Sequence, residues 1–241
     1  MDTFTAFAII TLAALLHATF QLSVSMVTLL SSHSIGSKHS GNKTLRLAAS
    51  FLSGTVVATL LVVSFFAYLA NSLYQAYVPL GVWAVVCGLL IGLGIAVWVF
   101  YYRRQAGTSL WIPRGMARFL TERTKATKYL AESFSLGLTS VLAELLFIVA
   151  PAAAAALSLT YLPYRLQLLG LFTYVAIASL GVAIVVILVG SGHKISVIQR
   201  WREENKRFLQ FFAGSGFLVL GAYLYTNVVA VAVMVGRGFV Q

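Results

Sequence analysis

Residues Ser133–Leu159 read SFSLGLTSVLAELLFIVAPAAAAALSL, a continuous apolar run in which Glu144 is the only charged residue. A helix needs about 20 such residues to cross the hydrocarbon core of a membrane, so this run is long enough to span it. A closed β-barrel would instead need strands of about ten residues that alternate between apolar and polar side chains, and this run does not alternate. The stretch therefore predicts a transmembrane helix.

Similar apolar runs lie on both sides of this one, and together they predict six transmembrane helices. Of the 241 residues, 60% are hydrophobic and 10% are charged, whereas soluble domains carry about 45–50% and about 25%. This composition excludes a soluble enzyme and indicates an all-α integral membrane protein, with residues 1–241 forming a single transmembrane domain. The expected spans are Phe4–Ser32, Leu47–Tyr74, Val78–Tyr102, Ser133–Leu159, Leu166–Gly190 and Phe208–Val235.

The positive charges are distributed unevenly along the chain. Lys and Arg outnumber Asp and Glu by 17 to 6, and all of these cations except Arg165 and Arg237 fall in the loops after the first, third and fifth expected spans. Their position between apolar runs speaks against a nucleic-acid-binding face. Because Lys and Arg are retained on the cytoplasmic side, we expect a multi-pass plasma membrane protein with both termini outside the cytoplasm.

The longest loop, residues 103–130, is expected to contain an amphipathic helix. Pro113 can occupy the first position of a helix, after which apolar and basic residues fall on opposite sides. We interpret this segment as an interfacial helix on anionic lipid; a simple solvated loop is the alternative. The apolar side would carry Met116, Phe119, Leu120 and Leu130, and the basic side Arg114, Arg118, Lys125 and Lys128.

The order of loop lengths divides the chain into two halves, residues 4–102 and 133–235, joined by the basic linker 103–130. In each half the second span opens with an Arg-Leu pair, Arg46-Leu47 or Arg165-Leu166. Since each half has an odd number of spans, the second half enters the membrane from the opposite side. We therefore expect two inverted three-helix repeats, a plan that recurs in secondary transporters and places the binding site near the midplane.

Several short motifs then resemble a known family. The layout, together with Ile198-Gln199-Arg200-Trp201 and the run from Gly214 to Leu224 (GSGFLVLGAYL), is similar to the lysine exporter superfamily. That superfamily includes the membrane electron carriers of cytochrome c biogenesis. The fourth span, Leu136–Glu144 followed by Pro151, resembles the span that opens the second half of those carriers. The resemblance implies a transporter-like membrane scaffold.

The chain departs from the electron carriers in its cysteines. Those carriers work through a cysteine beside a proline in the first and fourth spans, and this chain has one cysteine, Cys87. Storing an electron pair as a disulfide within one chain needs two sulfurs. The electron-carrier activity therefore does not carry over, and neither a disulfide nor a cysteine zinc site can form within the chain.

Two ionisable residues lie deep in the expected spans. Glu144 is about twelve residues into the fourth span, and His17 is about thirteen residues into the first, the counterpart position. Placing an ionisable side chain at the centre of a membrane costs about 2.5–3.5 kcal/mol of insertion free energy. Such a residue therefore indicates a functional or structural role. If a pseudo-two-fold axis relates the halves, His17 and Glu144 approach each other across it.

We predict a site for a substrate or a coupling ion around these two residues. Gln21 and Ser25 follow His17 at four-residue intervals and therefore share its helical face, and Pro151 removes an intrahelical hydrogen bond in the fourth span. His17 and Glu144 would relay a proton or bind a divalent metal cation. The alternative is structural: hydrogen bonds between helices for His17 and Glu144, and an ordinary kink for Pro151.

These features favour a secondary transporter that exports a small polar solute or a metal cation in a proton-coupled manner. No nucleotide-binding loop, zinc-protease motif or nucleophile elbow occurs, so we expect neither an enzyme nor a cofactor; a membrane enzyme would also need a reactive cluster at one interface. The alternative function is a non-transporting membrane subunit or assembly factor, a degenerate relative of the cytochrome c biogenesis carriers. Small-residue faces permit a homodimer or a membrane partner.

Overall fold

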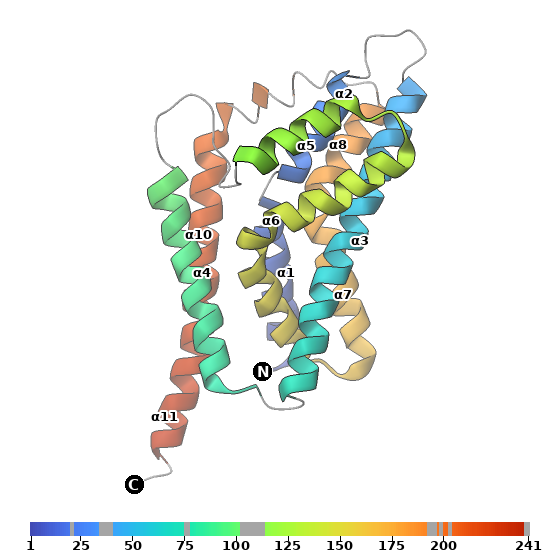
Figure 1. The fold of residues 1–241 in the computed structure, drawn as a ribbon. Coiled ribbons are helices and arrows are strands. Elements are labelled where there is room, and N and C mark those ends of the chain that lie inside the picture. The colour runs from blue at the N-terminus through green and yellow to red at the C-terminus, as the bar shows by residue number, and fades with distance from the viewer. Residues whose placement is uncertain are drawn as a thin grey trace.

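A computed structural model describes residues 1–19, 22–33, 41–74, 78–101, 114–191, 197, 200–201 and 204–238. Within these ranges the chain is almost entirely helical and forms no strand (Figure 1). The elements are α1 (Thr3–Thr19), α2 (Leu22–His33), α3 (Gly41–Tyr74), α4 (Leu80–Tyr101), α5 (Arg114–Ala126), α6 (Leu130–Leu159), α7 (Tyr164–Ala178), α8 (Leu180–Gly190), α10 (Lys206–Leu224), the π-helical segment η2 (Tyr225–Ala230) and α11 (Val231–Gly238).

Four helical segments are long and apolar enough to cross a membrane by themselves: Asn42–Tyr74, Leu80–Val99, Leu130–Leu159 and Arg207–Met234. Two further segments reach that length only as bent pairs, α1 with α2 and α7 with α8. The prediction of an all-helical protein is confirmed. Several apolar helices of this kind indicate a multi-pass membrane protein, with between four and six membrane-length segments in the described residues.

The first and fifth expected spans each correspond to a bent pair of helices, a bend that the sequence did not predict. The axes of α1 and α2 differ by 44°, and those of α7 and α8 by 54°. Ser179 separates α7 from α8 and Gly181 follows it, and serine and glycine pairs are a common cause of kinks. At the end of α1 the Thr19 hydroxyl donates to the Leu16 carbonyl 2.6 Å away, a contact that also bends helices.

Outward-facing side chains are apolar on most helices. Leu61, Phe65, Leu168, Ile187 and Phe208 are each more than half exposed. Apolar patches of this extent are rare on soluble monomers and mark contact with lipid or with a partner. Their distribution over α3, α7, α8 and α10 agrees with a bundle surrounded by lipid.

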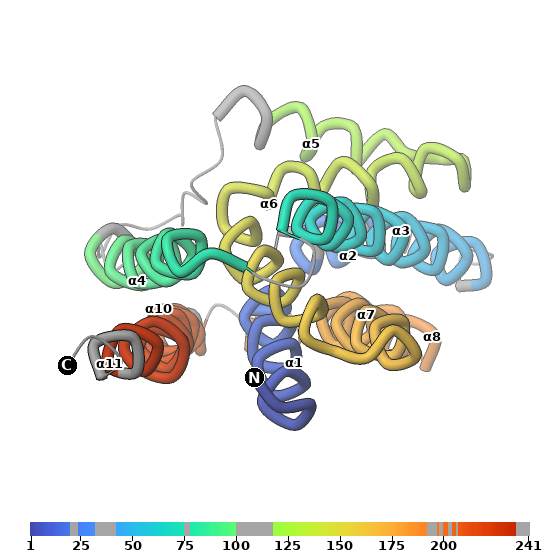
Figure 2. The backbone as a smooth tube through the Cα atoms, turned by 90° about the horizontal axis from the view of Figure 1, so that it is seen from below, coloured from blue at the N-terminus to red at the C-terminus, as the bar shows by residue number. Residues whose placement is uncertain are grey.

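Close contacts between glycines hold the bundle together. Gly54 of α3 and Gly137 of α6 face each other, so that an added Cβ on either one would collide with a backbone carbonyl of the other helix. Gly94 of α4 and Gly214 of α10 make a similar contact. Viewed along the helices, α4 and α10 lie on one side, α1 and α6 in the middle, and α3 with α7 on the other side (Figure 2).

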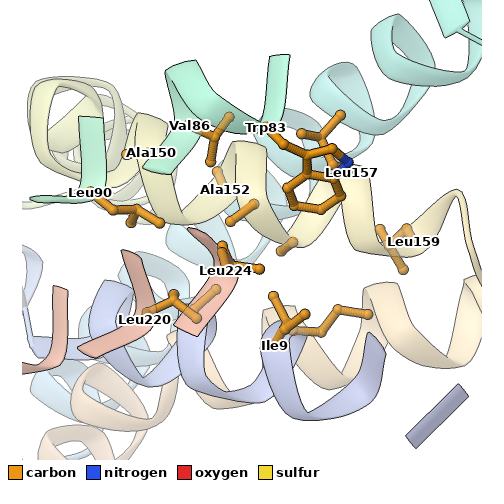
Figure 3. Packing of buried hydrophobic residues seen from close by; sticks show 14 of the residues in the cluster. Ile9, Trp83, Val86, Leu90, Ala150, Ala152, Leu157, Leu159, Leu220 and Leu224 are labelled. Carbon is orange, nitrogen blue, oxygen red and sulfur yellow. The ribbon is translucent and has the colours of Figure 1, made fainter. Parts of the chain in front are cut away.

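Two large clusters of buried apolar side chains fill the interior, together with a small third cluster of Ala58, Val141 and Ile148. The first, here called the terminal-end cluster, joins residues such as Ile9, Trp83, Leu90, Leu157 and Leu224 (Figure 3). The second, the α5-end cluster, joins Val24, Leu47, Phe51, Leu120 and Val182. The names reflect Figure 1, in which the N-terminus and α11 lie at one end of the bundle and α5 at the other.

The linker helix is present as expected. Helix α5 begins at Arg114, directly after Pro113, which lies outside the described residues together with Trp111. Leu120 is buried in the α5-end cluster, whereas Phe119 is 52% exposed beside the guanidinium of Arg123. Leu130 belongs to α6 and not to the apolar side of this helix, which corrects its assignment.

Exchanging Gly137 for alanine should destabilise the protein, because the new Cβ would press against the Phe51 carbonyl and the Gly54 Cα. Overpacking of this kind costs about 1–3 kcal/mol. Unfolding of the purified protein by denaturant in detergent, followed by circular dichroism, measures the change. The matched control is Gly88→Ala on α4, where a Cβ has nothing within 4 Å. Equal free energies of unfolding for the two variants would contradict the proposed contact.

Candidate functional site

A small buried cavity lies where the two bent helix pairs meet α3 and α6. Its wall takes in the end of α1, the start of α2, the junction of α7 with α8, and one face each of α3 and α6. The lining residues are His17, Ala18, Val24, Thr55, Thr59, Val141, Glu144, Ala178, Ser179, Gly181 and Val182. Both helix breaks therefore open onto one space, and this space contains both ionisable residues that the sequence singled out.

His17 occupies the last turn of α1 and is 4% exposed. Its Nδ1 lies 3.0 Å from the hydroxyl of Tyr174 on α7, and the two rings are 5.7 Å apart between centroids. Tyr174 is fully buried. Because Tyr174 engages Nδ1, the orientation of the imidazole is fixed.

Glu144 reaches the cavity from the middle of α6 and is 3% exposed. Helix α6 begins at Leu130, where the Glu132 carboxylate accepts the backbone N–H groups of Lys128 and Tyr129 at 3.1 and 3.4 Å. Helix α6 packs against α1, α3 and α4, and Glu144 lies on its buried side, whereas Leu142 and Leu146 on either side of it are 53% and 61% exposed. Burial in this position gives any charge on Glu144 strong electrostatic influence over the cavity.

Three hydroxyl side chains complete the polar part of the wall. Thr55 and Thr59 are four residues apart on α3 and so share one face. The Thr55 hydroxyl donates to the Leu52 carbonyl at 2.8 Å, which leaves its oxygen lone pairs available. The Ser179 hydroxyl is buried and has no hydrogen-bond partner among the described residues.

The space itself is small, and its wall combines polar and apolar side chains. The centres of water molecules have about 20 Å³ available to them, room for about one water. Leu16 and Tyr174, next to the cavity, belong to the terminal-end cluster, and Val24 and Val182, which line it, belong to the α5-end cluster. The cavity thus lies between two apolar layers, and a low local dielectric strengthens polar interactions inside it.

Only some of the predicted site residues line the cavity. His17 and Glu144 line the same cavity, as the sequence suggested. Ser25 is half-buried on α2 and does not line it, and Gln21 lies outside the described residues. Pro151 is buried in α6, which continues without a break to Leu159, and it does not line the cavity either.

The helix breaks are therefore at the ends of α1 and α7, not at the proline. Figure 1 shows α6 as one ribbon that changes direction along its course, and a proline within a helix is the usual cause of such a bend. In the described part of the chain, no group of three His, Cys, Asp or Glu side chains is placed to hold a metal ion. A divalent metal at His17 and Glu144 would have only these two strong donors there.

Sequence reasoning missed Tyr174, Thr59 and Ser179. Two local signals could have indicated the last two: threonines four residues apart in one span, and a serine followed by glycine inside an otherwise apolar run. Nothing local marks Tyr174, because its role depends on α7 packing beside α1.

Comparisons with protein-family models, with curated proteins and with solved structures find no match for this chain. The function therefore has to be argued from the geometry of the cavity.

Removing the Tyr174 hydroxyl should release His17 and weaken the bundle. In a double-mutant cycle of Tyr174→Phe with His17→Leu, we expect a coupling free energy of about 0.6 kcal/mol, the average for hydrogen bonds between membrane helices. Denaturant unfolding in detergent measures it. Tyr164→Phe is the control, since Tyr164 is 85% exposed. A coupling free energy indistinguishable from zero would show that the hydrogen bond between His17 and Tyr174 does not stabilise the protein.

Proposed function

We propose that this protein is a secondary transporter with six membrane crossings, built from two inverted three-helix repeats, which exports a small polar solute or a cation in exchange for protons. The observation that carries the proposal is the cavity, where two discontinuous helices and the buried side chains of His17 and Glu144 meet. In transporters, discontinuous helices at the interface between repeats form the binding sites for substrates and coupling ions.

The packing of the helices supports the repeats. We number the crossings α1/α2, α3, α4, α6, α7/α8 and α10 to α11, and a two-fold axis would exchange the first three with the last three. The contact of α3 with α6 then corresponds to that of α1 with α7, and the contact of α1 with α10 to that of α4 with α6; all four are observed. The pairs expected on the axis, α1 with α6 and α4 with α10, also pack together (Figure 2).

The exposed charges support the proposed orientation in the plasma membrane. Four exposed cations lie on or directly after α5: Arg118, Arg123, Lys125 and Lys128. Helix α5 is at the end of the bundle opposite the N-terminus and α11 (Figure 1). We propose that this end faces the cytoplasm, where such cations contact anionic lipid headgroups. The same layout agrees with the resemblance to the lysine exporters. We therefore propose that this protein is related to that superfamily.

Labelling of single cysteines tests the orientation. In a Cys87→Ser background, Asp2→Cys and Lys125→Cys each place one thiol at an exposed position on opposite ends of the bundle. A membrane-impermeant maleimide added to intact cells should label the cysteine at position 2, and should label that at position 125 only after lysis. The reverse pattern would overturn the proposed orientation.

Replacing Glu144 with glutamine should abolish proton-coupled transport, because the amide fills the same volume but cannot bind and release a proton. Wild-type proteoliposomes containing a pH-sensitive dye are exposed to Na⁺, K⁺, Mg²⁺, Mn²⁺, lysine or arginine. At least one of these solutes should change the internal pH of proteoliposomes that contain the wild type. None should change the internal pH of those that contain Glu144→Gln. Glu122→Gln, a change on the exposed face of α5, should behave as wild type.

Two results would contradict the proposal. One is a wild-type response that persists in Glu144→Gln. The other is a folded wild-type protein that responds to none of the probes, which would favour the non-transporting membrane subunit instead.

A further inference from the structure

We infer that the cavity binds a single dehydrated monovalent cation of about the size of Na⁺, held by the Glu144 carboxylate and the hydroxyl oxygens of Thr55, Thr59 and Ser179. This inference rests on the proposed function and names its substrate class. It follows from four properties of the cavity: its size, its donor atoms, one unsatisfied hydroxyl and the helix end that faces it.

The size of the cavity excludes most solutes. Space for about one water molecule is enough for an alkali cation without its hydration shell, but not for an amino acid or a hydrated ion. A cation that sheds its water must receive replacement oxygen atoms from the protein, as ions do in the filters of selective channels.

The donor atoms suit a hard monovalent cation. Apart from His17, the side-chain donors are oxygens, and among the described residues the lining includes neither Lys nor Arg. Transition metals favour nitrogen and sulfur ligands, and Mg²⁺ usually keeps several of its waters, for which this cavity lacks room. One carboxylate balances one positive charge, so the occupied site would be neutral in its apolar surroundings.

Ser179 supplies an independent indication of a ligand. Its side chain is 7% exposed, lines the cavity and makes no hydrogen bond to the described residues. A buried hydroxyl without a partner is unfavourable, and such groups need an explanation. A bound cation would use the oxygen lone pairs of Ser179 and remove that cost.

The end of α1 also favours a cation. The last carbonyl groups of a helix lack intrahelical partners and carry a partial negative charge. His17 and Ala18 lie in this last turn and line the cavity. The Ala18 carbonyl faces Gly181 of α8, where an added Cβ would lie 3.8 Å from its oxygen, so the negative end of α1 points towards the junction of α7 with α8.

Glu144 can then hold either the cation or a proton, and this competition couples the two. When the cation enters, the carboxylic acid gives up one proton and becomes a carboxylate; when the cation leaves, one proton returns, so charge is conserved. His17 on α1 is the other titratable residue of the lining, and Tyr174 on α7 lies behind it. The residues that α2, α3 and α8 contribute to the lining carry no titratable group.

Sodium chloride added outside sodium-free proteoliposomes should make the interior more alkaline, because each entering Na⁺ displaces one proton. Choline chloride at the same concentration controls for ionic strength. Thr59→Val removes one oxygen while keeping the side-chain shape, and should raise the Na⁺ concentration for half-maximal response by about tenfold or more. Thr139→Val is the matched control: it lies on α6, its hydroxyl donates to Ser135 at 2.7 Å, and it does not line the cavity.

Thermal unfolding of the detergent-purified protein gives a second readout that does not depend on flux. NaCl should raise the unfolding temperature of the wild type and of Thr139→Val above that in choline chloride, since a ligand stabilises the state it binds. Ser179→Ala should lose most of this increase. It should fold well, because the Ser179 hydroxyl has no hydrogen bond among the described residues to lose.

The outcomes separate this inference from the proposed function. If Na⁺ gives neither a pH change nor stabilisation while lysine or Mn²⁺ gives a response that needs Glu144, the sodium site is wrong and the transporter stands. If no probe gives a response, both are wrong. If Na⁺ acts equally on the wild type, Thr59→Val and Ser179→Ala, the cation binds elsewhere and the assignment of this cavity fails.

Discussion

The constraint on which this structure depends is that a polar group inside a membrane finds no water and must be satisfied by protein. Helices meet that demand for the backbone, because each segment bonds to itself. Ionisable side chains and the ends of interrupted helices cannot satisfy their own hydrogen bonds. In this bundle they lie together around the cavity. His17, Glu144 and Ser179, together with the breaks after α1 and α7, all face the same cavity, and the outside of the bundle is left to apolar side chains.

Close helix packing decides where that cavity can form. Lipid tails are as apolar as leucine, so membrane helices associate through tight contact and not through burial of apolar surface. The glycine pairs Gly54 with Gly137 and Gly94 with Gly214 let backbones touch, and they fix α3 against α6 and α4 against α10. With α6 held in this way, Glu144 lines the cavity, and the small residues Ala18, Ala178 and Gly181 leave the space that larger side chains would have filled.

The two apolar clusters on either side of the cavity give it the character of an enclosed site. A charge placed there is shielded from water on both sides, so under the proposed function the protonation state of Glu144 would decide which ions the cavity accepts. The hydrogen bond between His17 and Tyr174 ties the end of α1 to α7. Movement of one bent pair relative to the other would therefore alter the polar contacts of the cavity, as alternating access would require if the proposed function is right.

The sequence alone determined the membrane class, most helix positions and the two ionisable residues that line the cavity, because apolar length and the cost of a buried charge are local properties of the chain. It also placed the linker helix after Pro113. Tertiary structure decided the rest. The breaks after Thr19 and at Ser179, the unbroken course of α6 through Pro151, and the position of Tyr174 behind His17 depend on which helices pack together. A single span cannot reveal them, because the energy that bends a helix or orients an imidazole comes from its neighbours.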